Sequence, residues 1–144
     1  MEVMALDAHG IRSRVSGTEP VQFVAHGTGR RWSFDPGLID GMLQALWVWT
    51  RSLHDLSGLP LGADSVRRFT GDARKGPVLV EIGNIHLSDA NELTADVAAF
   101  DAEGYLCYQV DGFRVQCARS LNRLGGGWAG GERPSNDAAR KAAE

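Results

Sequence analysis

One long apolar segment, residues 35–57, constrains the fold of this chain more than any other feature. Asp35 suits the cap of a helix and Pro36 suits its first position. Apolar residues then recur at helical spacing until Ser57-Gly58 and Leu59-Pro60, which are typical of a helix end. The pattern predicts a helix of about six turns that is buried on most sides. Its apolar positions are Ile39, Met42, Leu43, Leu46, Val48, Trp49, Leu53 and Leu56.

Stretches typical of β-strands lie on both sides of this segment. They are residues 1–6, 11–15, 21–25, 65–69, 78–87, 93–100, 105–110 and 113–118. Residues 7–10 and 101–104 predict tight turns, and Gly83-Asn84 predicts a bulge. A curved antiparallel sheet wrapped around one central helix is the simplest way to bury both. The sequence therefore predicts an α+β hot-dog fold for residues 1–124 and a flexible Gly- and Ala-rich tail or linker for residues 125–144.

Composition excludes several classes of function. The formal net charge is −3, and a nucleic-acid-binding domain needs a basic face. We expect no membrane span, and the start of the chain lacks the regions of a signal peptide, so the expected compartment is the cytoplasm. Cys107 and Cys117 make neither a disulfide framework nor a metal site by their spacing, and we expect two small buried hydrophobic side chains.

Asp40 and Gln44 are the candidate chemical groups of the predicted helix. They are four residues apart and therefore share one face, which Trp47 and Arg51 extend. Gln44 can donate an amide hydrogen bond to the Asp40 carboxyl and fix its orientation. In an apolar environment the carboxyl group would stay protonated and could give its proton to a leaving hydroxyl. Alternatively, Asp40 is an acidic residue that the helix dipole favours near the N-terminus.

The run from Phe34 to Gln44 resembles the Asp-containing motif of polyketide synthase dehydratase domains, in which Gln or His follows the Asp by four residues. Family members often carry His where this chain has Asp35. Further stretches resemble the second half of such domains: Leu59-Pro60 and residues 95–104, 110–115 and 120–123. The resemblance implies two hot-dog units side by side, the first supplying a His base and the second the Asp acid. It implies that Asp40 is the general acid, Gln44 its orienting partner, and Trp47 and Pro60 candidate substrate contacts.

The His motif of the family is absent from this chain. That motif has Gly four residues after the His and Pro five residues further on. Only one His of the four is followed by Gly at this spacing, namely His54 by Gly58, and Ala63 stands where the Pro is required. We therefore expect the chain to be the C-terminal, acid-bearing half, with its His residues on the surface. It would need a second hot-dog unit and an acyl carrier protein, whose phosphopantetheine tethers the 3-hydroxyacyl substrate, and no further cofactor or metal.

Two other interpretations keep the fold and change the function. A homodimer could use Asp40 as an acyl-thioesterase, or the unit could act as a cyclase or isomerase. Alternatively, the unit binds an acyl chain or a carrier protein without catalysis, as a scaffold.

Overall fold

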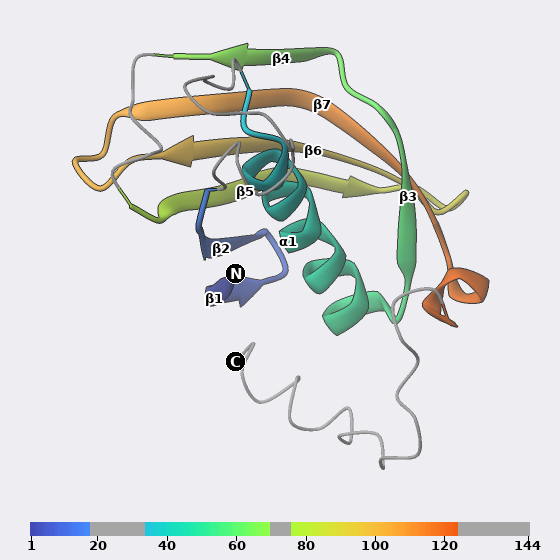
Figure 1. Cartoon of the computed structure of the whole chain (residues 1–144). Coiled ribbons are helices and arrows are strands. Elements are labelled where there is room, and N and C mark those ends of the chain that lie inside the picture. The colour runs from blue at the N-terminus through green and yellow to red at the C-terminus, as the bar shows by residue number, and fades with distance from the viewer. Residues whose placement is uncertain (18–33, 70–75, 124–144) are drawn as a thin grey trace, which may run out of the picture.

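The computed structural model describes residues 1–17, 34–69 and 76–123 (Figure 1). A seven-stranded antiparallel sheet curves around one helix, α1 (Pro36–His54). This arrangement confirms the predicted α+β hot-dog architecture. The predictions for residues 21–25 and for the tail at 125–144 fall outside the described residues.

Helix α1 begins as the sequence predicts. The Asp35 side chain accepts a hydrogen bond from the backbone N–H of Leu38 at 3.0 Å, and Pro36 opens the first turn. The helix ends at His54, three residues before the predicted end, because Asp55 adopts a left-handed conformation (φ 54°) and its N–H bonds the carbonyl of Thr50. Helix and sheet are therefore joined by a tight reversal.

The residues that predicted a helix stop form a strand instead, β3 (Ser57–Gly62). Among the described strands, β3 pairs with β7 alone, so it lies at an edge of the described sheet. Proline is tolerated at such an edge because its missing N–H removes no ladder hydrogen bond there. Pro60 therefore lies within a strand, although the same residue also fits a helix end.

The remaining strands agree closely with the predicted ones. The sheet order is β1-β2-β5-β6-β7-β3, and β4 also pairs with β7. The two segments predicted at 105–110 and 113–118 are one continuous strand, β7, in which Gly112 takes a positive φ of 57°. The bounds are β1 (Glu2–Asp7), β2 (Gly10–Val15), β4 (Ser65–Arg68), β5 (Val78–Leu87), β6 (Glu92–Phe100) and β7 (Leu106–Ala118).

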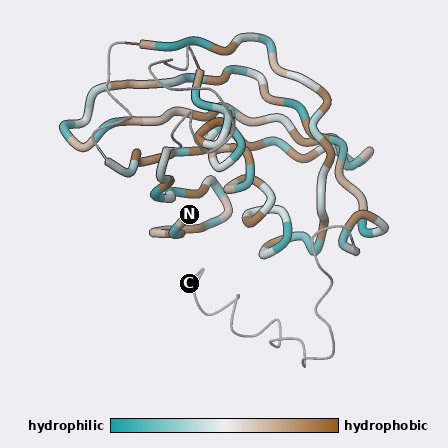
Figure 2. Tube along the Cα trace, in the orientation of Figure 1, coloured by the Kyte–Doolittle hydropathy of each residue, from teal (hydrophilic) through white to brown (hydrophobic). Residues whose placement is uncertain are grey.

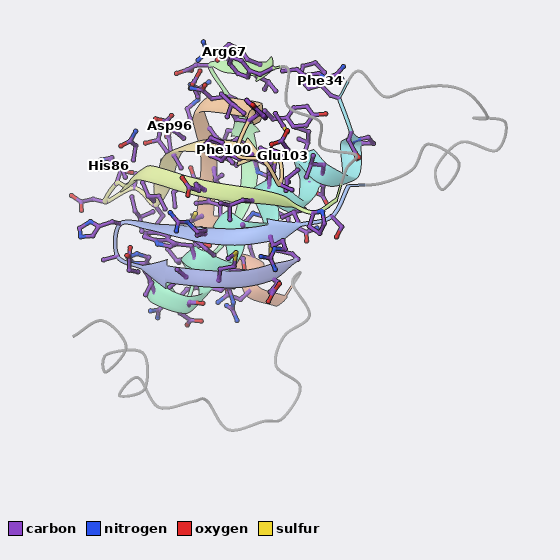
Figure 3. All side chains as sticks on the ribbon, turned by 90° about the vertical axis from the view of Figure 1, so that its left-hand side faces the viewer. Phe34, Arg67, His86, Asp96, Phe100 and Glu103 are labelled. Atoms are coloured by element: carbon purple, nitrogen blue, oxygen red, sulfur yellow. The ribbon has the colours of Figure 1, made fainter. Side chains whose placement is uncertain are left out.

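Asp96 links irregular points of three neighbouring strands. Its carboxylate accepts one hydrogen bond from the Asn84 side chain on β5 and one from the backbone N–H of Gly112 on β7, each 2.9 Å long. The pairing register shifts at each of these places, including the predicted bulge at Gly83-Asn84. Figure 3 shows Asp96 on the opposite side of the molecule from Phe34, which precedes α1. Asp96 therefore fixes the bulges where the sheet bends.

The core lies between α1 and the concave face of the sheet. Figure 2 shows hydrophobic residues along α1 and the strands behind it, with hydrophilic residues at the hairpin turns. Met42, Ala45 and Leu46 of α1 are fully buried. Cys107 and Cys117 are also buried, as predicted, and both lie on β7 ten residues apart, so they are not neighbours on adjacent strands.

Strand β4 is held to β7 through Asp111, whose carboxylate accepts hydrogen bonds from Ser65, Gln109 and Arg67. The pKa of Asp111 lies below its ordinary value of 3.8. The hydrogen bonds from Ser65 and Gln109 lower it most, and Arg67 lowers it to a smaller extent. A lowered folded-state pKa contributes stability that is present above the unfolded-state value and is lost as the pH falls through the folded-state value.

We therefore expect Asp111→Asn to lower the melting temperature at neutral pH. The difference from the wild type should shrink as the pH falls below about 4. Thermal unfolding of both proteins across this range measures the effect. Glu103→Gln, which removes an exposed carboxylate at the β6–β7 turn (Figure 3), is the control and should show no such convergence. A difference that stays constant with pH would contradict the prediction.

Candidate active site on helix α1

The Asp40 carboxyl and the Gln44 amide form a pair on the face of α1 that the sheet does not cover. The Gln44 Nε2 donates a 2.6 Å hydrogen bond to the Asp40 Oδ2. Both side chains are exposed, whereas the buried side of the helix faces the core. The predicted pairing is thus present. The helix is less buried than its apolar pattern predicts. Among the described residues, no apolar side chains enclose the exposed Asp40 carboxyl.

Trp47 and Arg51 continue this stripe toward the C-terminal end of α1. Both are partly buried, and both line a groove of about 520 Å³. This volume is in the range of small-molecule sites. The groove lies between α1, β3 and the short helix η2 (Arg119–Arg123) that follows β7. Its main lining residues are Gln44, Trp47, Val48, Arg51, Leu59 and Leu121.

Asp55, the left-handed residue after α1, holds η2 in place beside the groove. The side-chain amide of Asn122 donates to the Asp55 carbonyl at 3.0 Å and to its carboxylate at 3.3 Å. Arg51 contacts the same carboxylate at 3.2 Å, and Arg119 lies 4.0 Å from it. Leu121 can form a wall of the groove because these contacts attach η2 to the end of the helix. Sequence reasoning assigned no role to Asp55 or Asn122, since their contact spans 67 positions of chain.

Asp40, the predicted acid, does not itself line the groove. Pro60 is exposed on β3 and does not line it, although the adjacent Leu59 does. His9, His54 and His86 are exposed, as expected for surface residues, and none of the three lines the groove. The ring of His54 lies 4.9 Å from that of Trp49.

Within the three described ranges, no group of three or more His, Cys, Asp or Glu side chains could hold a metal ion. No helix in the same ranges is long and apolar enough to cross a membrane.

A family model described as the polyketide synthase dehydratase N-terminal domain matches residues 10–124. The chain belongs to the polyketide synthase dehydratase family. The match is to a model named for the N-terminal domain, whereas the Asp40 motif resembles that of the C-terminal half. The match therefore establishes the family, and it does not confirm the prediction that the chain is the C-terminal, acid-bearing half. A search of curated proteins found no match.

Solved dehydratase structures share the fold. GphF dehydratase 1 superimposes with a TM-score of 0.59 at 20% identity, covering 79% of this chain and 41% of that one. An inactive variant of the CurJ dehydratase, crystallised with a bound compound, gives a TM-score of 0.57 at 16% identity, covering 81% of this chain and 40% of that one. The dehydratase domain of the CurJ module of curacin polyketide synthase gives 0.54 at 16% identity, covering 76% and 37%. This member of the dehydratase family thus spans about two fifths of the length of the structures it matches.

Proposed function

We propose that this chain is the acid-bearing half of a dehydratase that acts on a 3-hydroxyacyl chain tethered to a carrier protein. The hydrogen bond from Gln44 to Asp40 carries the proposal, because it orients a carboxyl group on the uncovered face of the central helix. The dehydratase family supplies the reaction class. The absence of a His with the family spacing supports the acid-bearing half over the half that carries the base.

The reaction requires two groups on opposite sides of the substrate. A base on a partner removes the proton from C2, and the electron pair of that bond forms the C2=C3 double bond. The C3–O bond breaks, and Asp40 protonates the departing oxygen so that it leaves as water. Gln44 keeps the Asp40 carboxyl in position through its hydrogen bond.

The edge strand β3, which forms one side of the groove, is suited to contact with a second hot-dog unit. Leu59 and Leu61 on the edge strand β3 are 50% and 58% exposed. An edge strand with apolar side chains favours association, since it offers unpaired backbone groups and apolar area together. A unit docked there would cover the groove and its apolar lining.

We expect the chain alone to give no dehydration of a 3-hydroxyacyl-pantetheine thioester, and the same chain mixed with a His-bearing dehydratase half to form the enoyl thioester. Ultraviolet absorbance of the enoyl thioester measures the product. Release of free thiol, measured with a thiol reagent in the same samples, detects thioester hydrolysis. Robust dehydration by the isolated chain would refute the half-site proposal, and Asp40-dependent thiol release would favour the homodimeric thioesterase.

A further inference from the structure

The groove between α1 and β3 changes in chemical character along its length. Near Gln44 it is lined by the apolar surfaces of Trp47, Val48 and Leu59. At its far end it is lined by Arg51, whose side chain is 30% exposed. A ligand that fills the groove therefore meets apolar surface first and a guanidinium group last.

Among the described residues that line the groove, Arg51 is the one with a charged side chain, and Asp55 and Arg119 lie next to it outside the lining. The Asp55 carboxylate contacts Arg51 at 3.2 Å and lies 4.0 Å from Arg119. Two guanidinium groups thus share one carboxylate. Arginine presents several N–H donors in a planar fork, so Arg51 can keep its contact with Asp55 and still donate to a phosphate or carboxylate in the groove.

The helix sets the length of such a ligand. Arg51 follows Asp40 by eleven residues and Gln44 by seven, which correspond to about 16 Å and about 10 Å along the axis. We propose that the groove binds an extended chain whose apolar part lies on Trp47 and whose anionic oxygen group, a phosphate or a carboxylate, is bound by Arg51. That the reacting end of this chain lies at Asp40 rests on the function proposed above.

Two sources can supply the anionic group, and three ligands distinguish them. Octanoyl-pantetheine is neutral, octanoyl-phosphopantetheine carries a phosphate on the carrier arm, and 7-carboxyheptanoyl-pantetheine carries a carboxylate at the acyl end. Calorimetric titration of the whole chain should show at least one charged ligand binding roughly tenfold tighter than the neutral one. The charged ligand that gains affinity identifies the source.

Arg51→Met keeps the aliphatic stem and removes the charge, so it should abolish the preference for a charged ligand. Arg51→Lys should retain part of it. The readout is the ratio of affinities within one variant, which a loss of folded protein does not change. Arg67→Met, on β4 (Figure 3) and absent from the groove lining, is the matched control and should keep the wild-type ratio.

Asp40→Asn should also keep this ratio, because Asp40 lies at the opposite end of the stripe. If the chain mixed with a His-bearing half gave no dehydration but the ratio of affinities for charged and neutral ligands persisted, the proposed function would be wrong and the groove proposal would stand. The groove proposal is overturned if neither charged ligand binds tighter than the neutral one, or if Arg51→Met retains the preference.

Discussion

Asp40→Asn should lower the dehydration rate of the chain paired with a His-bearing half by about 10²- to 10⁴-fold, the usual contribution of a general acid. The side chain keeps its size and can still form a hydrogen bond with Gln44. The amide, however, has no acidic proton for the departing hydroxyl. The loss should appear in kcat, with a smaller change in KM, because the proton is needed only as the C3–O bond breaks.

Two further variants define the role of this pair. Gln44→Met should give a smaller loss than Asp40→Asn, since it removes the orienting hydrogen bond and leaves the acid in place. Asp89→Asn, at an exposed turn between β5 and β6, should retain wild-type activity. If the Asp40→Asn protein kept activity within about threefold of the wild type, Asp40 would not be the acid, because general acids contribute far more than this.

Leu46→Ala should have the largest effect on stability and lower the free energy of unfolding by about 2–5 kcal/mol. Leu46 lies on the face of α1 that packs against the sheet and is fully buried, so its truncation removes apolar contacts and leaves a cavity. Urea unfolding of the whole chain measures the loss as a lower midpoint at an unchanged slope.

The control for this prediction is Leu61→Ala on the edge strand. Leu61 is 58% exposed, so the same truncation should change the free energy of unfolding by about 0.5 kcal/mol or less. Equal losses for Leu46→Ala and Leu61→Ala would show that the helix does not pack on the sheet as described.

The features that the sequence predicts correctly depend on residues that are close in sequence, whereas the missed ones depend on long-range contacts. The cap at Asp35, the bulge at Asn84 and the turn before Gly104 follow from residues that are close in sequence, and all three are present. Strand β3 was missed because Gly58 and Pro60 also fit a helix stop, and only pairing with β7 decides between these readings.

The sequence by itself determined the central helix, the antiparallel sheet and the hydrogen-bonded pair of Asp40 and Gln44, because each depends on periodicity or on a spacing of four residues. Only the tertiary structure decided which face of the helix the sheet leaves uncovered and that Arg51 and Leu121 line one groove. The physical reason is distance along the chain. The wall that η2 adds to the groove depends on the contact of Asn122 with Asp55, and no local pattern encodes a contact between residues so far apart.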